Sequence, residues 1–295
     1  MNTTLQAALW MIGAITSFTL MAIAGRTVSI ELDTFEIMLF RSLTGIAIVV
    51  GIAWYAGSLG QIGRNRLGLH ATRNFCHFIG QNLWFYAITV IPLAQVFALE
   101  FTTPIWVILL SPLILQEKLT TIGVISAIIG FIGILIVTRP DPDSLSIGLL
   151  AAASCAFFFA LTAILTRLLT RTESITTILF YLTTMQAVFG LVFAGYDGDL
   201  ALPSLAALPW VILIGMAGLM AHFCLTNALK IAPASIVMPI DFVRLPTIAV
   251  VGMLLYDEPL DLLVFVGAAL IFAANYFNIT FAMRKPRPVV RDIEL

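Results

Sequence analysis

The feature that most constrains this chain is a series of ten apolar runs, each about as long as a membrane-spanning helix. A helix needs about 20 predominantly apolar residues to cross a bilayer, and runs of this kind follow one another with only short connections. Hydrophobic residues make up 60% and charged residues 11% of the 295 residues, which excludes a soluble globular class. The sequence therefore predicts an all-α membrane protein with ten transmembrane helices. The runs cover residues 5–28, 34–56, 68–90, 93–115, 121–138, 147–166, 174–194, 205–229, 233–256 and 262–283.

The short connections leave no room for a soluble catalytic or ligand-binding domain, so the function must lie within the membrane. The 15 basic residues form no basic face or arm, and the net charge is −1, which excludes nucleic-acid binding. An intramembrane enzyme is a remote alternative, because the chain contains no GxSxG or HExxH motif and no ligand-spaced set of His and Asp residues. The expected partners are the lipid bilayer and a small-molecule substrate, with no metal and no cofactor.

The distribution of Lys and Arg between the runs predicts the orientation of the chain. With a cytoplasmic N-terminus, ten Lys or Arg residues fall in inner loops or the C-terminal tail, and only Arg26 and Arg139 fall in outer loops. Cytoplasmic loops carry such an excess of positive charge. Both termini are therefore predicted to be cytoplasmic.

The chain also matches itself at a shift of 141 residues. This shift places Arg26 on Arg167, Pro92 on Pro233, Glu100 on Asp241, Phe101 on Phe242, Glu117 on Glu258 and Leu119 on Leu260. Each copy holds five spans, and because five is odd the second copy must enter the membrane from the opposite side. Inverted repeats of this kind are typical of secondary transporters. The predicted units are a first repeat (1–140), a second repeat (141–284) and a cytoplasmic tail (285–295).

The five-plus-five pattern resembles the drug/metabolite transporter superfamily, and more closely its EamA-type branch. Two segments carry the resemblance, LQEKLTTIGVISAIIGFIGILIV (115–137) and YDEPLDLLVFVGAALIFAANYF (256–277). In members of this branch, the fourth span of each half ends near a Gly-Glu pair and a glycine-rich fifth span follows. The two segments are similar to this region, although Gln116 and Asp257 stand here in place of the glycine. The resemblance covers nearly the whole chain and implies a carrier in a bacterial inner membrane. Members move amino acids, nucleoside-type metabolites, vitamins or drugs.

Two matched segments interrupt the apolar pattern, FALEFTTPIW (97–106) and MPIDFVRLPT (238–247). Each places an acid, Glu100 or Asp241, close to a proline, Pro104 or Pro246. Proline lacks an N–H and its ring clashes with the carbonyl four residues earlier, so both helices are predicted to break. Irregular backbone at membrane depth is tolerated only where it packs in protein or lines a water-filled cavity. Matched breaks in two repeats therefore point to a transporter's binding site.

Three arginines within apolar runs are the candidate partners of these acids, because an isolated charge at this depth costs about 2.5 to 3.5 kcal/mol. Arg41 matches the depth of Glu100, and Arg73 lies at the inner end of its run, closer to Asp241. Arg244 is three residues from Asp241, which brings the two side chains together on one helix face. The sequence thus predicts a Glu100–Arg41 pair and an Asp241–Arg244 pair.

Polar residues recur at helical spacing in the third run and predict one wet or ligand-facing side. They are His70, Arg73, Asn74, His77, Gln81 and Trp84, and the eighth run repeats the pattern with His222, Thr226 and Asn227. For the histidines, substrate contact or proton relay is weighed against a role as interhelical hydrogen-bonding groups. The other aromatic residues are expected mostly to face lipid or to pack.

These observations predict a carrier of a small polar metabolite that works by alternating access. Cationic groups outnumber acids among the candidate residues, which favours a carboxylate-bearing substrate, with an amino acid as the first expectation. A larger metabolite such as a vitamin, a nucleoside-type compound or S-adenosylmethionine is the alternative, together with drug efflux. Asp241 is expected to anchor Arg244, and Glu100, with fewer predicted partners, is the candidate proton carrier if protons are coupled. Direction of transport, coupling and oligomeric state stay open.

Overall fold

The computed structural model describes residues 3–116, 121–139, 146–196, 198, 200–259 and 261–284, and this part of the chain holds helices and no β-strand. The predicted tail, 285–295, lies outside the described residues, as does Glu117. The helices are α1 (Thr3–Val28), α2 (Thr34–Tyr55), α3 (Leu67–Val90), α4 (Leu93–Glu100), α5 (Thr103–Ile114), α6 (Thr121–Thr138), α7 (Ile147–Leu169), α8 (Ile175–Ala194), α9 (Leu208–Ile231), α10 (Ala234–Ile240), α11 (Arg244–Tyr256) and α12 (Leu262–Arg284). Short 3₁₀ turns cover Leu59–Gln61 and Asp241–Val243.

Within the described residues, six helical segments are long and apolar enough to cross a membrane, judged by length and composition. They are α1, α2, the stretch Leu93–Ile114, which contains both α4 and α5, and then α7, α8 and α9. Shorter apolar helices lie in α6, α11 and α12. The 24-residue α3 falls outside both groups, because the polar side chains that recur along it lower its hydropathy.

Residues at the helix starts supply the backbone N–H groups of the first turn with acceptors. Asp33 caps α2 by accepting a hydrogen bond from the Glu36 amide at 2.8 Å, and the Glu36 carboxylate accepts one from the Asp33 amide at 2.8 Å. Ser146 and Ser174 cap α7 and α8 in the same way with their hydroxyl groups. These local signals explain why α2, α7 and α8 begin close to the first residues of their apolar runs.

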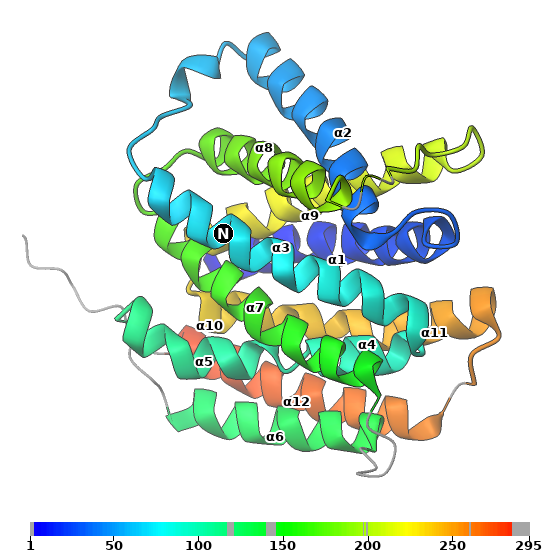
Figure 1. The fold of residues 1–295 in the computed structure, drawn as a ribbon. Coiled ribbons are helices and arrows are strands. Elements are labelled where there is room, and N and C mark those ends of the chain that lie inside the picture. Colours follow the sequence, from blue (N-terminus) through cyan, green and yellow to red (C-terminus); the bar gives the residue numbers. More distant parts are fainter. Residues whose placement is uncertain are drawn as a thin grey trace, which may run out of the picture.

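The closest helix pairs join the two halves of the sequence. α1 packs on α9, α2 on α8, α3 on α7 and α6 on α12. Figure 1 shows α2 beside α8 at one side of the assembly and α6 beside α12 at the other, with α4, α10 and α11 between them. Each pair takes one helix from before residue 140 and one from after residue 145, so the interior is shared by both halves.

Small residues allow this close approach, because without a hydrophobic driving force in lipid, helices associate through tight packing. A Cβ atom added to Gly190 on α8 would lie 2.9 Å from the backbone of Leu39 on α2. A Cβ added to Gly267 on α12 would lie 2.5 Å from the carbonyl oxygen of Gly133 on α6. Backbone atoms cannot move aside as a side chain can, so each site requires glycine.

Gly190→Ala is expected to destabilise the protein by about 1 to 3 kcal/mol, because the new methyl group forces α2 and α8 apart. The measurement is the thermal unfolding of the detergent-solubilised protein. Gly51→Ala on α2 is the matched control, since nothing lies within 4 Å of its added Cβ. Equal unfolding temperatures for the two variants would contradict the close contact at Gly190.

Candidate functional site

Two broken helices meet at the centre of the assembly and present an acid at each break. α4 ends at Glu100, and α5 begins at Thr103 with Pro104 in its first turn, where the missing N–H costs no hydrogen bond. α10 ends at Ile240, and the 3₁₀ turn Asp241–Val243 leads into α11. The Thr103 hydroxyl donates to the carbonyl oxygen of Glu100 at 2.5 Å. The carbonyl next to the break is therefore satisfied within the protein.

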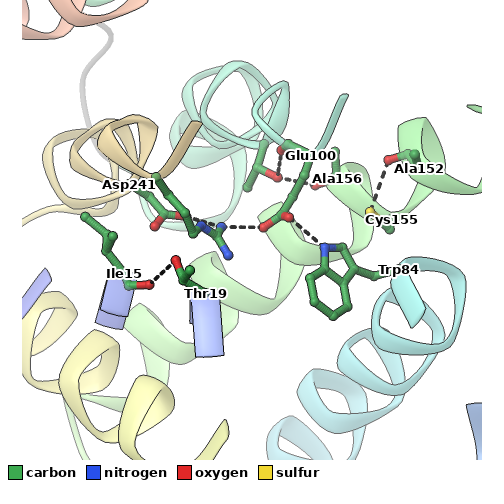
Figure 2. Close-up of polar contacts among 10 residues, drawn as sticks. Ile15, Thr19, Trp84, Glu100, Ala152, Cys155, Ala156 and Asp241 are labelled. Carbon is green, nitrogen blue, oxygen red and sulfur yellow. Dashed lines mark hydrogen bonds and ion pairs between the residues drawn. The ribbon is translucent and has the colours of Figure 1, made fainter. Parts of the chain in front are cut away.

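Arg244 lies between the two acids and pairs with both. Its guanidinium donates to Glu100 at 2.6 Å and to Asp241 at 2.5 Å. The indole N–H of Trp84 donates to the other oxygen of Glu100 at 2.7 Å. Figure 2 shows Trp84 and Asp241 on opposite sides of the Glu100 carboxylate. The Arg244 side chain is only 2% exposed, and its guanidinium stacks over Phe18 at 4.9 Å.

The other two buried arginines lie elsewhere, which corrects the expected pairing. Arg41 donates to the amide oxygen of Gln81 and does not reach Glu100. Arg73 donates to Thr166 at 3.1 Å and to Asn74 at 2.7 Å rather than to Asp241. Glu100 therefore has more partners than Asp241, and the reason for singling it out as a proton carrier is lost.

The same contacts decide the charge of the interior. Within the described ranges, neither Arg41 nor Arg73 has a carboxylate within ion-pair distance, whereas Arg244 is neutralised by two. The three arginines Arg41, Arg73 and Arg244 are balanced by three acids, Glu100, Asp241 and Glu36, when all six are ionised. All six residues are at most 7% exposed.

A cavity of about 700 Å³, counted with its open mouth, lies next to this cluster. The walls of this cavity lie close together, so the free space inside it is narrow. Predicted residues on its wall are His77, Gln81, Trp84, Glu100, Pro104, His222, Asp241 and Arg244. Sequence reasoning missed Met11, Phe18, Met21, Phe101, Thr103, Phe159, Thr162, Ala163, Thr166 and Leu225.

Seven predicted residues do not line the cavity: Arg41, Arg73, Asn227 and Pro246, together with His70, Asn74 and Thr226 of the polar stripes. Arg41 and Arg73 lie behind Gln81 and Thr166, to which they donate hydrogen bonds. The Asn227 amide donates to the Phe223 carbonyl of its own helix at 2.8 Å, and Pro246 lies in the first turn of α11.

Among the missed residues, only the threonines gave a usable signal. Thr162 and Thr166 are polar residues at i, i+4 spacing in an apolar helix. The aromatic residues Phe18, Phe101 and Phe159 line the cavity and are exceptions to the expectation that such side chains mostly face lipid or pack.

One end of the helix assembly is held together by contacts around Glu258. Arg26 at the end of α1 forms an ion pair with Glu258, and both carboxylate oxygens of Glu258 lie 3.1 Å from the amide nitrogen of Leu93 at the start of α4. The Arg26 guanidinium also stacks over the Tyr256 ring at 4.5 Å. We call Arg26, Leu93, Tyr256 and Glu258 the Arg26 latch. It joins the first half of the chain to the second.

Comparison with known proteins identifies the class of this assembly. A model of the EamA-like transporter family matches residues 5–139 and again residues 146–280. The chain belongs to the EamA-like transporter family. The resemblance to the drug/metabolite transporter superfamily is thereby confirmed, and the family describes integral membrane transporters rather than enzymes.

Several curated relatives of this EamA-type transporter carry names. It is 30% identical over 290 residues to a riboflavin transporter of Vibrio cholerae, with 96% of each chain covered. It is 32% identical over 217 residues to a riboflavin transporter of Brucella anthropi, covering 72% of this chain and 76% of the relative. An S-adenosylmethionine uptake transporter of Rickettsia prowazekii is 23% identical over 279 residues, covering 95% of this chain and 94% of the relative.

A solved crystal structure shares the fold, with a TM-score of 0.75 and 16% identity over 94% of this chain and 98% of that chain. The names of the relatives correct the expected substrate. An amino acid was the first expectation, but the named relatives carry riboflavin or S-adenosylmethionine. Both compounds belong to the alternative of a larger metabolite.

Proposed function

We propose that this EamA-type transporter is a secondary carrier of riboflavin, or of a flavin closely similar to it, across a bacterial inner membrane. The observation that carries the proposal is the central cavity, whose wall combines aromatic side chains with the charged groups of Glu100, Asp241 and Arg244. Phe18, Trp84, Phe101 and Phe159 supply flat apolar faces suited to a ring system. Riboflavin has an uncharged tricyclic ring, which can pack against these faces.

S-adenosylmethionine is the second candidate, because relatives named for its uptake cover nearly the whole chain. The higher identity to the riboflavin transporters makes a flavin the first candidate.

The proposed architecture is ten membrane crossings in two inverted repeats, 1–140 and 141–284, with both termini in the cytoplasm. The double match of the family model and the pairing of helices across the two halves support it. Breaks at Glu100 and at Asp241 then occupy matching positions of the two repeats, as binding sites of inverted-repeat transporters do.

Alternating access is the proposed mechanism. With this orientation the Arg26 latch lies at the outer end of the helices and closes that side of the cavity. Residues Met11, Thr166 and Leu225 carry the cavity wall towards the cytoplasmic ends of α1, α7 and α9. The narrow interior must widen before a tricyclic ring enters, so binding requires the two halves to move relative to one another.

Riboflavin is expected to raise the apparent melting temperature of the detergent-solubilised protein, and S-adenosylmethionine to raise it less. A ligand that binds only the folded state stabilises it by about 2.7 kcal/mol at 100 times its Kd. Labelled riboflavin should then enter liposomes with saturation and counterflow and be recovered chemically unchanged. A shift with S-adenosylmethionine and none with riboflavin would contradict the flavin proposal and favour the second candidate.

A further inference from the structure

Two histidines without a hydrogen-bond partner contact one another on the wall of the central cavity. His77 on α3 is 1% exposed and His222 on α9 is 3% exposed. Their ring centroids lie 4.6 Å apart and their planes cross at 87°. All four ring nitrogens are buried and none has a partner in the part of the chain that the structure describes. Burying polar atoms in this way is unfavourable unless a further group supplies the hydrogen bonds.

Neighbouring side chains hold the two rings in place and offer them no hydrogen bond. Phe18 meets the His222 ring edge-on at 5.7 Å, and Phe159 lies 6.2 Å from the His77 ring. Both histidines line the cavity. Their rings are therefore fixed on its wall with their nitrogens uncommitted.

Other polar groups on the wall are already engaged. Gln81 accepts from Arg41, Trp84 donates to Glu100, and Thr166 accepts from Arg73. Asp241 Oδ1 and Arg244 Nε are single unpartnered atoms within the ion-pair cluster. The two histidines thus present the largest group of uncommitted hydrogen-bonding atoms on the cavity wall.

The crossed rings restrict which ligand group they suit. A neutral imidazole offers one donor and one acceptor, both directed in the plane of its ring. The imide edge of a flavin is flat, so it can align with only one of two rings that cross at 87°. Hydroxyl groups on consecutive tetrahedral carbons point in different directions, and each both donates and accepts. A polyol chain can therefore satisfy both rings at once.

We infer that His77 and His222 bind the polyhydroxylated chain of the substrate while the aromatic wall holds its flat ring. The inference rests on the proposed function and adds a chemical class to it: a flat heterocycle that bears hydroxyl groups on tetrahedral carbons. Both candidate substrates have this chemistry, riboflavin in its ribityl chain and S-adenosylmethionine in its ribose.

The test compares riboflavin with lumiflavin, which keeps the ring and carries a methyl group in place of the ribityl chain. His77→Phe and His222→Phe keep an aromatic ring and remove the nitrogens. Each variant is expected to weaken riboflavin binding by the detergent-solubilised full chain about tenfold, through the lost hydrogen bonds, and to keep lumiflavin affinity within about twofold. Unchanged lumiflavin binding also reports that the variant is folded.

His70→Phe is the matched control. His70 lies on α3, is 1% exposed and also has unpartnered ring nitrogens, but its ring packs at a tilt against that of Tyr181, with centroids 4.5 Å apart, and it does not line the cavity. The affinity of the His70→Phe variant for both flavins should equal that of the wild-type protein. The inference would be overturned if His77→Phe and His222→Phe lost affinity for both flavins equally, or kept their affinity for riboflavin. Either result would leave the proposed function intact.

Wild-type protein that binds neither flavin would instead contradict the proposed function. The same variants are then measured with S-adenosylmethionine and with adenine, which lacks the ribose. A loss of affinity confined to the ribose-bearing compound supports the role of the histidine pair, and any other pattern of affinities overturns it.

Discussion

Arg244→Ala is expected to abolish riboflavin uptake and to destabilise the protein by about 3 to 5 kcal/mol, because it leaves two buried carboxylates without their shared cation. Glu100 and Asp241 are each 7% exposed, and Arg244 bonds to both. The measurements are thermal unfolding in detergent and uptake into liposomes. Arg244→Lys should recover part of the stability only, since an ammonium lacks the planar fork of the guanidinium.

The control for this prediction removes all three charges together. Glu100→Gln, Asp241→Asn and Arg244→Gln in one chain leave no uncompensated ion, so most of the lost stability should return while uptake stays absent. Wild-type stability in Arg244→Ala would contradict the shared ion pair. Uptake by the triple variant would show that the cluster is not part of the transport site.

Arg26→Ala is expected to open the outer side of the cavity and to raise its accessibility from outside about tenfold, which corresponds to about 1.4 kcal/mol. The reason is that the substitution removes two contacts of Arg26, the ion pair with Glu258 and the stacking on Tyr256. The side chains of Arg26 and Glu258 are 22% and 12% exposed, so their ion pair is partly buried. The measurement uses Thr103→Cys on the cavity wall, in a chain whose native cysteines are replaced, and a membrane-impermeant thiol reagent. Labelling rates from outside are compared in liposomes.

Arg139→Ala provides the matched control for the latch. Arg139 pairs with Asp261 at 2.5 Å, but the two side chains are 53% and 45% exposed, and exposed ion pairs contribute little. Its labelling rate should equal that of the parent chain. An equal rate for Arg26→Ala would mean that the latch does not hold the outer side closed.

The helix boundaries and the position of the helix breaks could be predicted from the sequence because both depend on local chemistry. Backbone N–H and C=O groups in lipid must form their hydrogen bonds within the segment, so an apolar run such as 5–28 forms the helix Thr3–Val28. Proline removes a donor wherever it stands, and the interruption next to Glu100 falls within three residues of Pro104. The Asp241–Arg244 contact is also local, since the two residues share one turn.

The partner of Glu100, the cavity wall and the substrate class required the tertiary structure or its relatives. Depth along the membrane is one coordinate and does not say which helices are neighbours, so Arg41 matched Glu100 in depth while Arg244 reaches it in space. Lipid and protein interior are both apolar, so hydrophobicity could not tell that Phe18 and Phe159 face the cavity. By itself the sequence determined a membrane carrier with acids at two broken helices. The packing of the two halves decided which charges are neutralised and which side chains surround the substrate, because those contacts join residues more than 100 positions apart.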